Sequence, residues 1–381
     1  MVKLKDICTI NPKATILVDD LEVSFVPMPK VGEQGEFDPS EIRTYQEVKK
    51  GFTNFQNGDV LFAKITPCME NGKGAIAKSL RNGYGFGSTE FHVLRPDNSK
   101  VTSEWLYYLT SWSEFRKDAE NNMTGSAGQK RVPKTFLENY DVNLPELQRQ
   151  KEIATILDHI GEMIALRKEQ LEKLDQLVKS RFIELFGATS AENCTKQIKD
   201  YAEVLGGYAF KSDLFCADAI PVIRISNINN GCVELDYNIC FDELFWEQNK
   251  RFRVEQNDVL MAMSGATTGK SGINREYMPA LINQRVACIR AKDGVACPTF
   301  LFVATQLEWM YDLIQETSAG CAQPNISGKQ IENMPVPDAS YEQQQQFASF
   351  VEQTDKSKFA IQQSLDKLEL LKKSLMQQYF G

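Results

Sequence analysis

Residues 146–187 read ELQRQKEIATILDHIGEMIALRKEQLEKLDQLVKSRFIELFG, and within them apolar side chains recur every seven residues. A seven-residue apolar period held over four heptads is typical of a helix in a coiled coil. An ordinary amphipathic core helix is the alternative, but such helices are usually shorter. The predicted seam positions are Leu157, Ile160, Ile164, Leu171, Leu174, Val178 and Leu185.

Residues 341–381, YEQQQQFASFVEQTDKSKFAIQQSLDKLELLKKSLMQQYFG, predict a second helix of the same kind, although Lys358 and Lys372 interrupt its apolar stripe. At 1.5 Å per residue, each helix of about 40 residues would be roughly 60 Å long. If the two helices pair antiparallel, the regions that precede them lie at opposite ends, related by a pseudo-two-fold axis. The second set of seam positions is Leu365, Leu368, Leu371 and Leu375.

The rest of the chain repeats itself in the same order, at an offset of about 194 to 199 residues. Asn57–Leu61 recurs as Gln256–Leu260, and Val93–Arg95 recurs as Cys288–Arg290. The pair Gly72-Lys73 likewise recurs as Gly269-Lys270. Chance could give one such match but is a poor explanation for a collinear series, so we expect the chain to consist of two copies of one unit.

The repeat predicts four segments: a domain over 1–145, a long helix over 146–187, a second domain over 188–340 and a long helix over 341–381. The domains are rich in turn residues between short apolar runs, which indicates strands, and each contains one helical stretch, near 104–120 and 298–316. We therefore expect an α+β fold with two pseudo-repeated mixed domains and an antiparallel coiled coil.

Composition argues against several classes of protein. No run of about 18 apolar residues is present to span a membrane, and the first residues do not resemble a signal peptide. Nine cysteines without a C-x-x-C pair and only two histidines predict neither a disulfide framework nor a metal site. We expect a cytoplasmic protein. The net charge of −8 is unusual for a DNA-binding protein, so any DNA binding would need a partner that supplies phosphate contacts.

Catalytic motifs are not found. Gly265–Ser271 resembles a phosphate-binding loop, but three residues separate its glycines where the motif requires four. Its counterpart, Asn71–Gly74, is not such a loop. A turn between two strands explains both copies, with the lysine available for a phosphate. We expect no enzymatic activity and no cofactor in this chain.

Polar loops are the remaining candidates for function, because Gln, Asn, Arg and Lys side chains hydrogen-bond the edges of bases. Ordinary surface loops are the alternative explanation. The candidate DNA contacts are Lys64, Thr66, Lys73, Ser88, Thr89, Gln129, Lys130 and Arg131 in the first domain, and Ser264, Thr267, Lys270, Asn283, Gln284, Arg285, Gln323 and Asn325 in the second.

Three stretches, Lys64–Ile76, Gly87–Pro96 and Glu146–Leu157, resemble the DNA-specificity subunits of type I restriction-modification systems. The resemblance covers essentially the whole chain and is weaker in the second unit, where Asn283–Arg285 stands in place of Thr89–Phe91.

This resemblance implies two target recognition domains, each reading one half of a bipartite, asymmetric DNA site, with the helices setting the spacer between the halves. It also implies a complex with two methyltransferase subunits, which hold S-adenosylmethionine, and with restriction-translocase subunits that cleave. A coiled-coil scaffold whose globular ends bind proteins is the alternative function, and an enzyme is a third.

Overall fold

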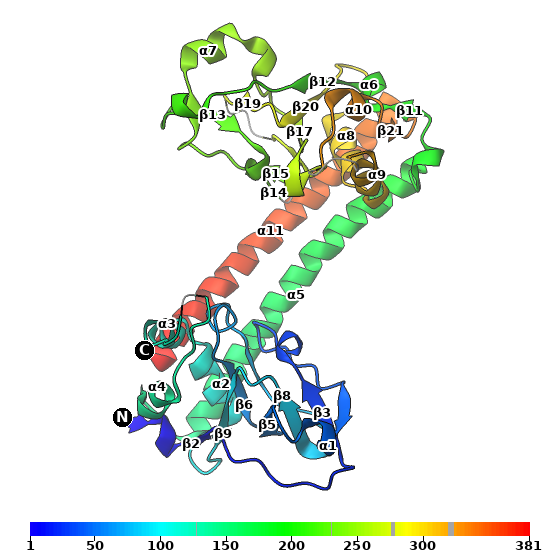
Figure 1. Cartoon of the computed structure of the whole chain (residues 1–381). Coiled ribbons are helices and arrows are strands. Elements are labelled where there is room, and N and C mark those ends of the chain that lie inside the picture. Colours follow the sequence, from blue (N-terminus) through cyan, green and yellow to red (C-terminus); the bar gives the residue numbers. More distant parts are fainter. Residues whose placement is uncertain (127, 230, 276–278, 319–323) are drawn as a thin grey trace. The chain divides into compact units, whose positions relative to one another are not determined.

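The computed structural model describes residues 1–126, 128–229, 231–275, 279–318 and 324–381. They form two compact units, Met1–Leu166 with Ser364–Gly381, and Arg167–Gln363. Both units mix helices with sheets (Figure 1). No helix in the described ranges is both long enough and apolar enough to cross a bilayer.

The first unit contains two four-stranded sheets, of order β2-β9-β6-β7 and β4-β3-β8-β5, and α2 packs against β6, β7 and β9. Its elements are β1 (Val2–Lys3), η1 (Leu4–Asp6), β2 (Cys8–Ile10), β3 (Glu22–Val26), η2 (Met28–Lys30), β4 (Ile42–Thr44), α1 (Tyr45–Val48), β5 (Thr53–Gln56), β6 (Val60–Ala63), β7 (Gly74–Ile76), η3 (Arg81–Gly83), β8 (Tyr84–Gly87), β9 (Phe91–Pro96), α2 (Ser103–Ser111), α3 (Ser113–Asn121), α4 (Lys134–Asn139) and β10 (Asp141–Val142).

The second unit contains a six-stranded sheet, β12-β20-β17-β18-β15-β14, and a three-stranded one, β16-β13-β19. Its elements are η4 (Ala191–Asn193), β11 (Lys196–Gln197), α6 (Ile198–Tyr201), β12 (Ala202–Gly206), η5 (Ser212–Leu214), β13 (Ile220–Ile223), η6 (Ile225–Asn227), β14 (Ile228–Asn229), β15 (Gly231–Val233), β16 (Cys240–Phe241), α7 (Glu243–Gln248), η7 (Lys250–Phe252), β17 (Val259–Ala262), η8 (Gly265–Thr267), β18 (Ser271–Ile273), β19 (Leu281–Ile282), β20 (Val286–Ala291), α8 (Pro298–Thr305), α9 (Glu308–Ser318), α10 (Gly328–Glu332) and β21 (Pro335–Val336).

The repeated sequence motifs form the same central strands in both units. Strand β6 is apolar throughout because Val60 and Phe62 belong to one core and Leu61 and Ala63 to another. Beside it, the buried Asp59 carboxylate accepts two hydrogen bonds from Arg95, at 2.8 and 2.7 Å. The repeat places the same ion pair, between Asp258 and Arg290, beside β17.

A buried glutamine joins the start of each long helix to its domain. In the first unit the Gln150 side chain accepts a hydrogen bond from Thr102 N and donates to the carbonyls of Lys100 and Pro145. In the second unit Gln344 accepts from Cys297 N and donates to two carbonyls in the same way. Both glutamines are fully buried, which explains why this position recurs in the repeat.

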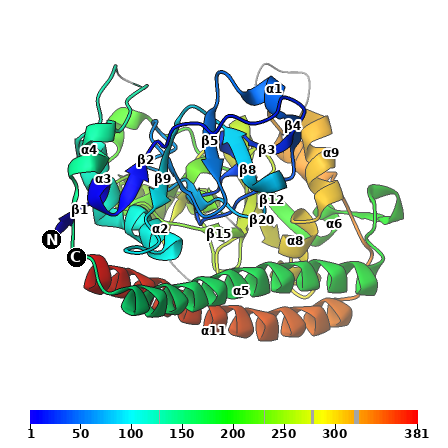
Figure 2. The same cartoon turned by 90° about the horizontal axis from the view of Figure 1, so that it is seen from below.

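The predicted long helices are α5 (Leu147–Phe186) and α11 (Tyr341–Phe380), and each is divided between the two units. In the second unit Lys358 forms an ion pair with Asp175, while the Phe347 ring lies 5.3 Å from that of Phe182. Residues later in α5 therefore contact residues earlier in α11, so the two segments run antiparallel (Figure 2).

The first unit shows the same antiparallel arrangement for the other halves of these helices. The Arg149 guanidinium lies over the Tyr379 ring, at 5.6 Å. Twelve residues further along α5, a Cβ at Gly161 would lie 3.9 Å from Lys372 Nζ.

Two predicted seam positions are wrong. In α11, Leu371 is 46% exposed. Leu185 is 39% exposed, whereas Phe182 is fully buried and Phe186 packs against the core. The physical reason is that a straight helix has 3.6 residues per turn, so its buried face drifts by about 20° per heptad. Among the other seam residues, Leu157, Ile160, Val178 and Leu365 are buried, whereas Ile164, Leu171, Leu174, Leu368 and Leu375 are half-buried.

Candidate nucleic-acid interface

Three loops of the first unit that the sequence singles out lie side by side. Lys64, directly after β6, donates its backbone N–H to Glu90 O (2.9 Å) and accepts from Val132 N (2.8 Å). Thr66 N donates to Lys130 O (3.1 Å). The side chains of three segments therefore lie close together: the loop after β6, the β8–β9 connection and the segment before α4.

Arg131 is held by the carboxylate of Glu90, which is not among the contacts predicted from the sequence. Its Nε and Nη2 atoms donate to the two Glu90 oxygens, both at 2.9 Å, and its Nη1 donates to Gln129 O at 3.2 Å. The hydrogen bonds from Arg131 lower the pKa of Glu90 below its usual range. Glu90 could have been selected from the sequence because it is an acidic residue that directly follows the candidate Thr89.

Other predicted contacts of the first unit have internal partners. The Thr66 hydroxyl donates to Glu70 at 2.8 Å, and Ser88 Oγ accepts from Glu90 N at 3.2 Å. Lys73 Nζ donates to Val31 O at 3.1 Å and to Met28 O at 3.5 Å, so its charge faces η2. In contrast, Thr89, Gln129 and Lys130 are exposed.

The buried His92 side chain contacts the segment before α4 and the residue that follows β2. Its Nε2 donates to Val132 O (2.8 Å), and its Nδ1 lies 3.0 Å from Asn11 Nδ2. Burial lowers the pKa of His92, which favours the neutral ring. These contacts are those of a structural histidine.

The second unit builds the same cluster from different side chains. Met263 N donates to Arg285 O (2.8 Å) and Ile326 N donates to Met263 O (2.9 Å), as Lys64 and Val132 do in the first unit. Gly265 N donates to Pro324 O (3.1 Å), the counterpart of the Thr66–Lys130 bond.

These bonds align Arg285 with Glu90, one residue away from the alignment predicted from the sequence. The correction arises because β20 begins at Val286 and β9 at Phe91, which fixes the offset at this strand. Gln284, Arg285 and Asn325 are exposed, whereas Asn283 uses its side-chain oxygen to accept from Arg285 N at 3.3 Å. Gln323 lies outside the described residues.

The Gly-Lys turns join two antiparallel strands in each unit, β6 with β7 and β17 with β18. Gly72 and Gly269 have φ values of 93° and 85°, which favour glycine.

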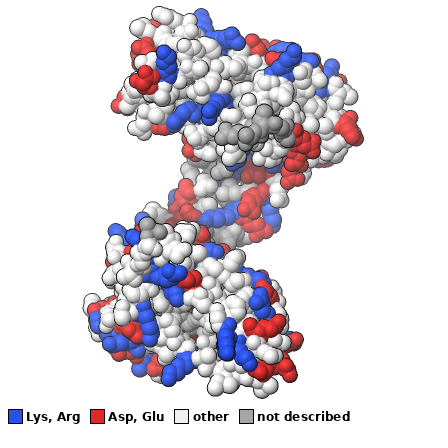
Figure 3. Space-filling view, viewed as in Figure 1, with Lys and Arg blue, Asp and Glu red and all other residues white. Residues whose placement is uncertain are grey.

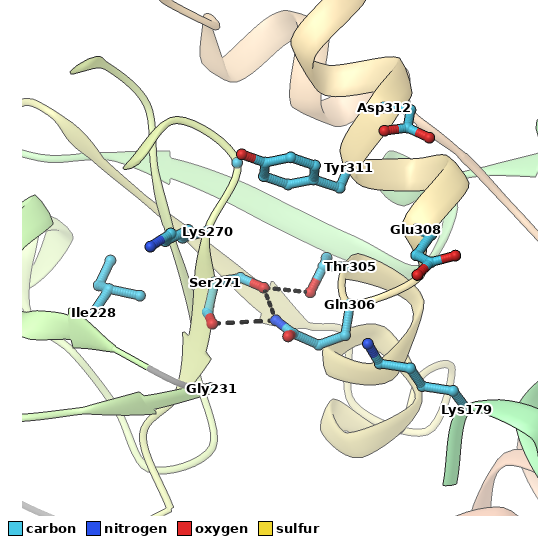
Figure 4. Close-up of a pocket in the computed structure, with 11 residues that line it drawn as sticks. Lys179, Ile228, Gly231, Lys270, Ser271, Thr305, Gln306, Glu308, Tyr311 and Asp312 are labelled. Atoms are coloured by element: carbon cyan, nitrogen blue, oxygen red, sulfur yellow. Dashed lines mark hydrogen bonds between the residues drawn. The ribbon is translucent and has the colours of Figure 1, made fainter. Parts of the chain in front are cut away.

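Lys270 lines an open pocket of about 470 Å³ beside α9, together with Lys179 and Tyr311 (Figure 4). At the floor of this pocket Ser271 bonds to Thr305 and Gln306. Earlier in the same β17–β18 connection, the hydroxyls of Ser264 and Thr267 are buried, and neither has a hydrogen-bond partner among the described residues.

Charge on the face shown in Figure 3 is mixed, with basic and acidic side chains interspersed in each unit. Among the described residues no cluster of His, Cys, Asp and Glu could hold a metal ion. The chemistry that the loop clusters offer is hydrogen bonding by exposed guanidinium, amide and ammonium groups.

Comparison with known proteins adds a family to this geometry. The model of the type I restriction modification DNA specificity domain matches residues 1–176 and again residues 192–371. The EcoAI specificity subunit of a type I restriction enzyme from Escherichia coli is 40% identical over 209 residues, which are 53% of this chain and 34% of that protein. The MjaVIII specificity subunit from Methanocaldococcus jannaschii is 23% identical over 312 residues, 77% of this chain and 72% of that protein. The chain thus spans about a third of the length of the Escherichia coli relative.

Solved structures share the fold. A chain from a study of complex assembly and conformational transition of the type I R-M system superposes with a TM-score of 0.62 at 17% identity, covering 99% of this chain and 96% of that one. The S subunit of a type I restriction-modification system from M. genitalium gives a TM-score of 0.58 at 13% identity, covering 100% and 95%.

Proposed function

Since the chain belongs to the type I restriction modification DNA specificity family, we propose that it is the non-catalytic, sequence-reading subunit of a type I restriction-modification complex. The observation that carries this proposal is the loop cluster built twice on the same backbone hydrogen bonds but with different exposed side chains. A shared scaffold with different side chains is what reading two different half-sites requires.

Each unit would read one half of a bipartite, asymmetric site on double-stranded DNA. The side chains proposed to contact DNA are Thr89, Gln129, Lys130 and the partly exposed Arg131 in the first unit, and Gln284, Arg285 and Asn325 in the second. Two methyltransferase subunits carrying S-adenosylmethionine, together with restriction-translocase subunits, would supply the catalysis and the phosphate contacts that a chain of net charge −8 does not favour.

A domain exchange tests the modular reading. Residues 188–340 are replaced by the second domain of another family member, and the methylated motif is mapped in cells that carry the methyltransferase partner. We expect one half of the motif to change while the other half stays the same. A change in both halves would contradict the proposal, and methylation without any sequence motif would favour the scaffold function.

The paired helices are proposed to set the spacer. Inserting one heptad after Leu166 in α5 and one after Gln363 in α11 leaves the contacts within each unit unchanged, because both insertions fall between the units. Seven helical residues add about 10 Å, or about three base pairs. The mapped spacer should lengthen with both half-sites retained. An unchanged spacer would show that something other than these helices determines it.

A further inference from the structure

The first loop cluster contains an acid–base pair that the second cluster lacks. Glu90 and Arg131 form a two-point ion pair in which the acid is mostly covered and the base is 42% exposed. At the equivalent positions the second unit has Arg285 and Asn325. The arginine therefore lies in the segment before α4 in the first unit, but in the connection between β19 and β20 in the second.

We infer that Glu90 is a positioning residue for base recognition: it fixes the guanidinium of Arg131, and Arg131 reads one guanine of the first half-site. The inference rests on the proposed function and adds a residue whose side chain acts only through its neighbour.

The hydrogen-bond inventory of Arg131 supports this role. A guanidinium has five N–H groups in one plane. The Glu90 carboxylate accepts hydrogen bonds from the N–H of Nε and from one N–H of Nη2, and Gln129 O accepts one from Nη1. One N–H on each terminal nitrogen remains, held in a fixed plane. Guanine presents two acceptors, N7 and O6, at its major-groove edge, which is the partner that two such donors match.

The backbone makes the pair rigid. Glu90 O accepts from Lys64 N, and Arg131 exchanges two backbone hydrogen bonds with Thr124, at 2.9 and 2.8 Å. Both ends of the ion pair are therefore attached to paired backbone, so Arg131 has little freedom left to lose when it binds.

The second cluster provides an internal contrast. Arg285 is exposed and, within the described part of the chain, forms no ion pair. Asn325, which replaces Arg131, has an amide that suits adenine. The two clusters thus differ in charge at the same two backbone positions, and these positions are where we expect the half-sites to diverge.

The test compares Glu90→Gln with Arg131→Ala in the complex of the full chain with its methyltransferase partner, by mapping methylated motifs genome-wide. Glu22→Gln is the matched control, because Glu22 also holds an arginine, Arg81, in the same unit but on a different sheet. We expect Glu90→Gln to lower the preference for one base of the first half-site about tenfold, with every other position unchanged. The double variant should equal Arg131→Ala, since Glu90 acts only through Arg131.

A merely structural role predicts a different result. If Glu90→Gln reduced methylation at all sites equally without altering the motif, the inference would be overturned, as it would if the motif and the methylation level both stayed unchanged. Effects of Glu90→Gln that added fully to those of Arg131→Ala would also contradict it. A wild-type complex without any bipartite motif would refute the proposed function itself, and the inference with it.

Discussion

The ring of Phe380, the penultimate residue, lies 5.3 Å from the ring of Trp105, so α11 ends in the core of the unit that begins at Met1. In the second unit Phe186 of α5 lies 5.0 Å from Phe300. The repeat thus builds each core from a domain and the end of a long helix.

Replacing Phe380 with Ala should lower the free energy of unfolding of the first unit by about 2 kcal/mol, because a half-buried aromatic side chain is removed from contact with Trp105. Phe359→Ala is the control on the same helix, since Phe359 is 66% exposed. Urea unfolding followed by Trp fluorescence measures both. Equal effects of the two variants would show that Phe380 does not contribute to the core.

A fragment of residues 1–190 should form a symmetric dimer. It lacks Ser364–Gly381, which belong to the first unit, but the repeat supplies Phe182 and Phe186 at the positions of Met376 and Phe380. A second copy can therefore fill the gap, and burial of apolar surface favours it by about 25 cal/mol per Å². Light scattering should give twice the fragment mass, and with the methyltransferase partner the motif should become palindromic. A monomer, or an asymmetric motif, would contradict helix pairing of this kind.

Removing the acidic residue of each buried ion pair should lower the free energy of unfolding substantially. Asp59→Ala leaves Arg95 without its partner and should destabilise the first unit by about 3 kcal/mol. Asp258→Ala should act similarly on the second unit, although Arg290 there retains a contact with Glu255. The control is Glu114→Ala, which breaks an exposed pair with Lys117 and should cost less than about 1 kcal/mol. Calorimetric unfolding of the variants distinguishes these values.

Stability of the first unit should fall as the pH decreases below about 6.5, the usual pKa of histidine. Burial lowers the pKa of His92 in the folded chain, so the unfolded chain binds more protons in this range and stability is lost on acidification. His92→Gln should flatten the pH dependence of unfolding between pH 7 and 5. Identical profiles for the unaltered protein and His92→Gln would exclude His92 as the cause.

Features that depend on local periodicity could be predicted from the amino-acid sequence. The seven-residue stripe predicted both long helices, and the collinear motifs predicted two copies of one domain, because apolar spacing reflects which face of an element is buried. Strand β6 and its copy β17 could be found from the same motif, since a strand covered on both sides is apolar throughout.

The side chains that meet across loops could not be predicted and are known from the folded structure. Lys73 and Arg131 look alike in the sequence as basic loop residues, yet Lys73 donates to the Val31 carbonyl whereas Arg131 pairs with Glu90. Leu185 continues the heptad but is exposed, because the drift of a straight helix brings Phe182 and Phe186 to the core instead. Loop contacts join residues tens of positions apart and follow from how the strands align, which no local pattern encodes.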